Sequence, residues 1–239
     1  MLPQDTNTDT LPGDDADGAS GQPADVTPAN PGDEVAHPRR IRSFVRRAGR
    51  TSTGQQRAID DLGPKFIVPY QAEPLDWAAT FGREAPSILE IGFGMGETTA
   101  HIAKLRPQDN FLGCEVHEPG VGALLKLIGE NDLQNVRIMN HDAVEVIAHM
   151  LTEQSLDGVH IFFPDPWPKK RHMKRRLLTP EFLNLIYPKL KKGAFIHVAT
   201  DWVPYAEFVM KSFAQVPEYV GGEVERPRSE EHTSELQSH

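Results

Sequence analysis

The sequence predicts an α/β fold in which helices cover both faces of a mostly parallel β-sheet. Between residues 85 and 215, short apolar runs alternate with segments of helical pattern, which is typical of parallel sheets joined by crossover helices. A glycine-rich stretch separates the first apolar run from the first helical segment and indicates a tight turn at a helix N-terminus. Ligands of such sheets bind beyond the carboxyl ends of the strands, so the residues at those ends are the candidates for a functional site.

Five strands are expected, each short, rich in Ile, Val, Leu or Phe, and bounded by Pro, Gly, Asp or Asn. They cover residues 87–92, 110–116, 136–139, 158–163 and 194–199. Helices are expected over residues 97–105, 120–130, 143–151, 180–190 and 204–213. The helix from Pro180 has Thr179 as its N-cap. It is expected to end before Gly193, after three lysines that complement the negative C-terminal end of the helix.

Composition limits the class of protein. The chain has 239 residues, of which 38% are hydrophobic and 25% charged, and this fits one globular domain with tails. No apolar run approaches the roughly 18 to 20 residues that span a membrane, and no secretory signal pattern opens the chain. The single cysteine, Cys114, excludes an intrachain disulfide and favours a reducing compartment. We therefore expect a cytoplasmic protein without a membrane partner, either a monomer or a homodimer.

Charge is unevenly distributed along the chain, whose net charge is −9. Residues 1–36 hold seven Asp, one Glu and no Lys or Arg, and without any aromatic residue they are expected to be a disordered acidic extension. An arm over residues 37–60 contains seven Arg, and a second basic cluster covers residues 169–176. Either cluster alone could be a solvated face, but the two together favour a polyanionic partner.

The acid and glycines at the end of the first strand are the first candidate binding residues. Glu90 precedes Gly92, Gly94 and Gly96, and glycines allow the backbone to approach a ligand closely before a helix N-terminus. The spacing differs from the dinucleotide pattern G-x-G-x-x-G. A turn that tolerates no bulky side chain would also explain these glycines, so they are a weak indication by themselves.

Two more acids follow the next two strands. Glu115 lies about 20 residues after the glycines, where an acid commonly accepts hydrogen bonds from ribose hydroxyls. Asp142 follows the third strand and could hold an exocyclic amine of adenine, although it also suits the N-cap of the next helix. Three acids at three successive strand ends favour an adenosine-containing ligand.

The string after the fourth strand, FFPDPWPKKR, is the most specific in the chain. Prolines on both sides of Asp165 stiffen its loop, and Trp167 offers a face on which a base could stack. A rigid surface turn with a half-buried Trp remains the alternative. The fifth strand ends before Asp201 and Trp202, which adds a second carboxylate to the same sheet edge. The two carboxylates could accept from the ring N–H and the amino group of guanine, leaving its N7 free.

Six strings, taken in order, resemble those of the bacterial tRNA (guanine-N7)-methyltransferases. They are RRIRSFVRRAGR, LEIGFGMGE, GCEVHEPGVG, NHDAVEV, FFPDPWPKKRHMKRR and HVATDWVPYAE, and the match covers roughly residues 39 to 214. The resemblance implies a Rossmann-like class I methyltransferase fold over residues 61–227. It also implies S-adenosylmethionine as cofactor, tRNA as partner, and methylation of N7 of a guanosine in the tRNA variable loop.

The resemblance also assigns roles to individual residues. It implies that Glu90, Glu115, Asp142 and Asp165 occupy cofactor-binding positions together with the three glycines, and that Asp165 is also catalytic. Lys169 and Asp201 take substrate-binding positions. The RNA-contacting segment comprises six residues: Arg171, His172, Met173, Lys174, Arg175 and Arg176. No metal is expected, because the ten histidines show no ligand spacing such as H-E-x-x-H.

The C-terminus departs from the pattern of the family. The Thr-Lys-Phe-Glu motif and the Gly-His…Trp-Asp strand of the family are absent, and residues 228–239 resemble a translated sequencing adapter. The sheet is therefore expected to lack its last strands and to have an open edge, which would impair this polypeptide.

Three other functions remain open at this point. The PDPW string loosely resembles the N-P-P-Y loop of amine methyltransferases. A non-catalytic RNA-binding relative would keep the same fold, and a dinucleotide dehydrogenase is disfavoured by the glycine spacing.

Overall fold

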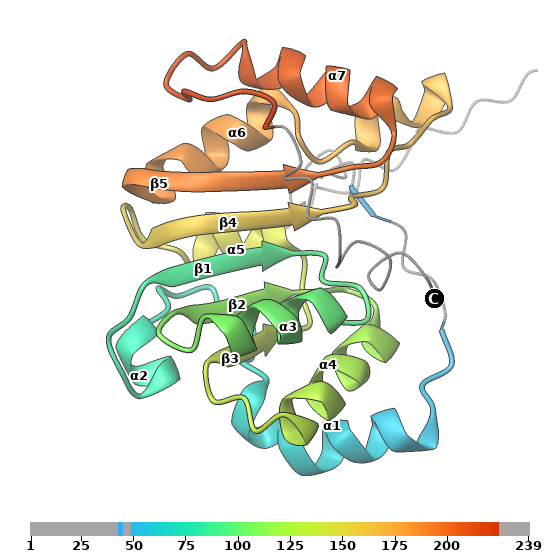
Figure 1. Cartoon of the computed structure of the whole chain (residues 1–239), viewed down its shortest axis with the longest axis vertical. Helices are drawn as coiled ribbons and strands as arrows, with labels where there is room; N and C mark the ends of the chain where they lie inside the picture. The colour runs from blue at the N-terminus through green and yellow to red at the C-terminus, as the bar shows by residue number, and fades with distance from the viewer. Residues whose placement is uncertain (1–42, 45–48, 225–239) are drawn as a thin grey trace, which may run out of the picture. The chain divides into compact units, whose positions relative to one another are not determined.

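A five-stranded sheet, parallel throughout, organises the described part of the chain (Figure 1). The computed structural model describes residues 43–44 and 49–224. The strand order is β3-β2-β1-β4-β5. The strands are β1 (Ser87–Ile91), β2 (Asn110–Cys114), β3 (Val136–Met139), β4 (Leu156–Phe162) and β5 (Leu190–Ala199). The predicted α/β class and all five predicted strands are confirmed.

Helices cover both faces of this sheet. They are α1 (Thr53–Phe66), α2 (Trp77–Phe81), α3 (Glu97–Leu105), α4 (Glu118–Glu130), α5 (Ala143–His149), α6 (Pro180–Ile186) and α7 (Val203–Phe213), with 3-10 turns η1 (Lys170–Arg175) and η2 (Tyr187–Lys189). Alternate side chains of β1 face opposite layers: Ile88 packs with α1, α3 and α4, whereas Leu89 and Ile91 pack with α5, α6 and α7. Figure 1 shows α3 and α4 in front of the sheet and α5 behind it.

The expected end of the fourth predicted helix is wrong. Helix α6 ends at Ile186, and Gly193 lies inside β5 with a φ of +81°. Lys191 sits on β5 and forms an ion pair with Asp157 of β4, with Nζ 2.6 Å from Oδ2. Lys191 and Lys192 therefore belong to a strand whose second edge is unpaired within residues 49–224, and an edge strand accommodates charged side chains.

Two helices near the start of the described region were not among the predicted elements. Helix α1 begins with a capping box in which the Ser52 hydroxyl and the Gln55 side chain each accept a backbone N–H of the other residue. Helix α2 is capped by Asp76, whose carboxylate accepts from the N–H of Ala79. Helix α1 runs across the boundary expected at residue 60. The acidic extension, residues 37–42 and 45–48 of the arm, and the tail over 228–239 lie outside the described residues.

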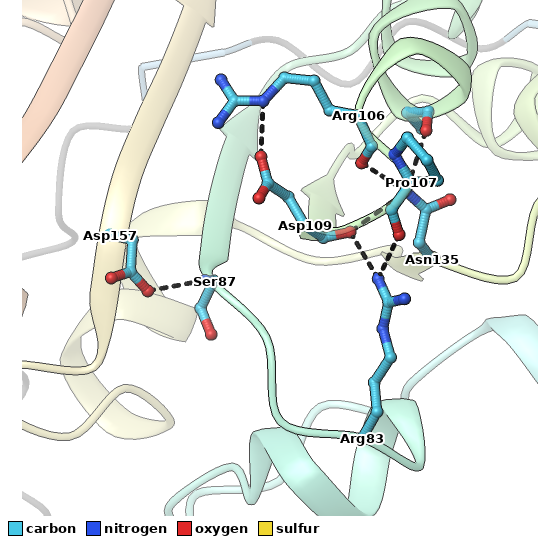
Figure 2. A network of polar contacts seen from close by, with 8 residues as sticks. Arg83, Ser87, Arg106, Pro107, Asp109, Asn135 and Asp157 are labelled. Carbon is cyan, nitrogen blue, oxygen red and sulfur yellow. Dashed lines mark hydrogen bonds and ion pairs between the residues drawn. The ribbon is translucent and has the colours of Figure 1, made fainter.

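Polar contacts tie the amino ends of the strands together (Figure 2). The carboxylate of Asp157 accepts the backbone N–H of Ser87, which joins β4 to β1. The backbone carbonyl of Asp109 accepts from the Arg83 guanidinium at 2.9 Å and from the Asn135 amide at 3.1 Å. These bonds fix the edge of the sheet opposite to the predicted site.

Nowhere in the described ranges is a helix long and apolar enough to cross a membrane.

Candidate active site

The loop from β1 to α3 forms the centre of the candidate site. Gly92, Gly94 and Gly96 have φ values of +73°, +58° and +82°, a region that side chains disfavour. At Gly96 a Cβ would lie 2.6 Å from the Cβ of Leu124, so α4 leaves no room for one. A Cβ at Gly92 or Gly94 would meet nothing within 4 Å. The backbone of this loop therefore faces open space at the carboxyl edge of the sheet.

Glu115 connects the end of β2 to the glycine loop. Its Oε2 accepts the N–H of Gly94 at 2.9 Å, and its Oε1 accepts those of Val116 and His117 at 2.7 and 2.9 Å. A carboxylate has about four acceptor positions, so one remains for a ligand hydroxyl. The Glu115 carboxylate thus lies at the glycine loop. Its main role in this geometry is to hold the backbone of the glycine loop against the backbone that follows β2.

Glu90 is almost fully buried on β1, with 2% of its surface exposed. Its Oε2 makes no hydrogen bond within the described residues. Burial raises the pKa of Glu90 to about 7, and the nearby Thr99 hydroxyl partly opposes this shift. The strand register places Glu90 beside His160 of β4, whose Nδ1 also makes no hydrogen bond to the described residues. Glu90 is therefore a buried acid at the candidate site, and a nearby cation would stabilise its ionised form.

Asp142 is the N-cap of α5, as the alternative interpretation of this residue predicted. Its Oδ1 accepts the N–H of Val144 at 3.0 Å. The preceding residue, His141, stacks on Tyr70 at 3.8 Å between ring centroids and pairs with Glu145 at 2.6 Å. Tyr70 was not among the predicted residues, because nothing in its local sequence signals this contact. Together these residues hold the loop after β3 in place.

The loops that carry Asp165 and Asp201 start from adjacent strand ends. The N–H of Phe163 donates to the carbonyl of Ala199 at 2.8 Å, which joins the ends of β4 and β5. Asp165 and Asp201 are both exposed to solvent. Two exposed carboxylates therefore follow β4 and β5 at the carboxyl edge, and β4 is the neighbour of β1.

Trp167 is half-buried, as the alternative interpretation of its loop predicted. Its Nε1 donates to the backbone carbonyl of Ser43 at 3.0 Å. The guanidinium of Arg175 lies 5.4 Å from the ring centroid, and the ring of His172 meets it edge-on. Much of the ring surface thus packs within the protein, and stacking of a base on Trp167 stays a prediction.

The basic cluster over residues 169–176 divides into exposed and buried side chains. The exposed members are Lys169, Lys170, Arg171, Met173 and Lys174, and the half-buried ones are His172 and Arg175. Desolvation and the charges of Arg171, Arg175 and Lys169 lower the pKa of His172. Arg176 differs from the others, because it is 5% exposed. Its predicted contact with RNA stays a prediction.

Part of the Arg-rich arm also reaches this edge. Besides the bond from Trp167 to Ser43, a Cβ at Gly49 would lie 2.4 Å from the His117 ring and 2.8 Å from Pro119. The arm therefore touches the loops that follow β2 and β4.

Across the described residues, no group of three His, Cys, Asp or Glu side chains is arranged to hold a metal ion.

Known proteins similar to this chain point to one family. A protein-family model described as "Putative methyltransferase" matches residues 84–238. A tRNA (guanine-N(7)-)-methyltransferase from Cupriavidus metallidurans is 73% identical over 235 residues, covering 95% of this chain and 90% of that protein. One of the same name from Cupriavidus necator is 68% identical over 219 residues, covering 91% and 83%.

Among solved structures, a precorrin-6y C5,15-methyltransferase from Geobacter metallireducens is 14% identical, with a TM-score of 0.45 over 55% of this chain and 63% of that one. The relatives match nearly the whole chain at high identity, and the family model matches well over half of it. This chain therefore belongs to the tRNA (guanine-N(7)-)-methyltransferase family.

Proposed function

We propose that this chain methylates N7 of a guanosine in the variable loop of tRNA, with S-adenosylmethionine as the methyl donor, at the carboxyl edge of β1, β2, β4 and β5. The observation that carries the proposal is the arrangement at this edge. Two exposed carboxylates, Asp165 and Asp201, follow β4 and β5 at the same edge as an open glycine loop and a run of exposed basic side chains.

The residues around the glycine loop suit S-adenosylmethionine. The unpartnered Oε2 of Glu90 suits the ammonium group of the methionine part, and the spare acceptor position of Glu115 suits a ribose hydroxyl. Asp142 would hold the amino group of adenine with the oxygen that does not cap α5. When bound, the cofactor supplies a methyl group on a positively charged sulfur.

The carboxylates would act on the base. The N7 of guanine has an in-plane lone pair and needs no base to remove a proton, so catalysis depends on positioning, which can supply up to about 7 to 11 kcal/mol. Positive charge develops on the purine as the methyl group arrives. Asp165 stabilises that charge, and Asp201 and Lys169 hold the base. The exposed basic residues bind the tRNA phosphates.

Replacing Asp165 tests the assignment. Unmodified tRNA is incubated with radiolabelled S-adenosylmethionine, and the product is tested for strand cleavage at N7-methylguanosine. Asp165→Asn removes the charge at nearly constant shape, and the rate should fall by about 10²- to 10³-fold. Glu153→Gln, at an exposed carboxylate in the turn before β4, should keep the wild-type rate.

Two results would overturn the proposal. Because the missing C-terminal strands are expected to impair this chain, the deciding protein is a version with those strands restored; if that version leaves tRNA unmethylated, or methylates it outside the variable loop, the function is refuted. An unchanged rate in Asp165→Asn would refute the role of that carboxylate while leaving the function in place.

A further inference from the structure

Arg176 is the one fully buried member of the basic cluster over residues 169–176. Its neighbours Arg171 and Lys174 are exposed and have the access that a phosphate contact needs. Burying a charged group costs free energy unless other groups compensate it. The contacts that compensate this guanidinium therefore indicate what Arg176 does.

Those contacts join two loops. The Nε of Arg176 donates to the backbone carbonyl of Pro166 at 2.9 Å. Its guanidinium carbon lies 4.6 Å from the ring centroid of Phe208, 5.4 Å from that of Tyr205 and 5.7 Å from that of Trp202. A guanidinium is planar and weakly hydrated, so it packs on aromatic faces and donates from its edge at the same time.

Two of these partners directly follow the carboxylates of the proposed site. Pro166 directly follows Asp165, and Trp202 directly follows Asp201 and is the N-cap of α7. Burial raises the pKa of Tyr205 to about 12, with Arg176 lowering it and Asp165 raising it through their charges. Arg176 and Asp165 therefore both lie close enough to Tyr205 to act on its hydroxyl.

We propose that Arg176 is a positioning residue that fastens the loop of Asp165 to the N-terminal end of α7, and that it does not contact tRNA. The inference rests on the proposed function, since it assigns the loop a role in methyl transfer. With Arg176 in place, the two carboxylates keep a set separation at the sheet edge. Without it, the loop of residues 163–169 is held by its strand ends and by the bond from Trp167 to Ser43.

Two substitutions separate positioning from phosphate binding. Arg176→Lys keeps the charge but loses the planar fork, and Arg176→Leu removes the charge but keeps the apolar bulk. For a positioning residue, Arg176→Lys lowers kcat by about 10- to 100-fold, the range expected when reacting groups move by about 1 Å. The KM values for tRNA and S-adenosylmethionine stay within about threefold. The salt dependence of tRNA binding keeps its wild-type slope in both variants.

Two control variants calibrate these measurements. Lys174→Ala removes an exposed charge of the cluster and should lower the slope of log K against log salt by about 1. Lys211→Ala removes an exposed charge of α7 and should change neither the slope nor kcat. Trypsin gives a readout without methylation, because the loop carries several cleavage sites. At a temperature well below the unfolding midpoints of both proteins, cleavage between residues 169 and 176 should be several-fold faster in Arg176→Lys.

The opposite pattern would overturn the inference. If Arg176→Lys keeps the wild-type kcat and Arg176→Leu lowers the salt slope by about 1, Arg176 binds a phosphate. Should Arg176→Leu fail to fold, Arg176→Lys alone still decides through kcat and trypsin cleavage. An enzyme with restored C-terminal strands and no methyl transfer would refute the proposed function, whereas the trypsin and tRNA-binding comparisons would still judge Arg176.

Discussion

Replacing Glu90 by Gln should remove a pH dependence from the stability of the protein. Burial raises the pKa of Glu90 from an ordinary value of 4.5 to about 7, so the folded state binds this proton more tightly than the unfolded state does. The contribution of Glu90 to stability is therefore lost as pH rises from 4.5 towards 7. At about 1.4 kcal/mol per pK unit, the full loss is about 3 kcal/mol.

Urea unfolding at pH 5, 6, 7 and 8 measures this effect. Gln is neutral at every pH and has nearly the shape of protonated Glu, so both proteins should have similar stability at pH 5. The variant should then gain about 2 to 3 kcal/mol over wild type by pH 8. Glu153→Gln, at an exposed site, should differ from wild type by the same amount at every pH. A gap between Glu90→Gln and wild type that does not widen with pH would refute the reasoning.

The cofactor should narrow that gap. An ammonium group at the unpartnered Oε2 of Glu90 would favour the ionised carboxylate and lower its pKa. Saturating S-adenosylmethionine stabilises the folded state of any variant that binds it, but at pH 8 it should stabilise wild type more than Glu90→Gln. Equal stabilisation of the two proteins would place the ammonium group away from Glu90.

Two more predictions test the scaffold of the site. In Gly120→Ala the new Cβ would lie 2.1 Å from the carbonyl oxygen of Gly94, so the glycine loop must shift. The affinity for S-adenosylmethionine, measured by calorimetry, should therefore fall at least about tenfold, or about 1.4 kcal/mol. Gly54→Ala, which meets nothing within 4 Å, is the matched control, and equal affinities in both variants would contradict the close approach. Burial, with the charges of His197 and Arg106, lowers the pKa of His160 to about 4, so stability is lost as pH falls from 6.5 towards 4. His160→Phe should escape this loss and gain about 1 to 3 kcal/mol on wild type between pH 7 and pH 4.5 in urea unfolding; a constant gap would argue against a buried neutral imidazole.

The strands could be predicted because each contains a short run of apolar residues that the sheet buries. All five residues of β1 and all five of β2 are buried, so their composition carries the signal. The first residues of β5 carry no such signal. They include Lys191 and Gly193, which read as a helix end, and only the neighbouring strand explains them. Helix α1 was not predicted, although the capping box at Ser52 and Gln55 is a local sequence signal for its start.

The candidate site was predictable in outline for a topological reason. Carboxyl ends of parallel strands meet at one edge, so Glu90, Glu115 and Asp142 had to lie near one another once the strands were located. Which of their oxygens are free was not predictable. Glu115 uses three acceptor positions for backbone amides and Asp142 uses one for its own helix, whereas Glu90 has an oxygen without a partner among the described residues.

Burial of charge is the property that a linear pattern hides most completely. Arg175 and Arg176 are adjacent and chemically identical, yet one lies over Trp167 near the surface and the other is enclosed by aromatic rings of α7. What separates them is packing against residues that follow much later in the chain, and no count of local charge contains that information. The position of a charge in the fold decides its partner, because an exposed cation can exchange water for phosphate. A buried one must be satisfied by the protein itself, and in Arg176 that requirement fastens the loop of Asp165.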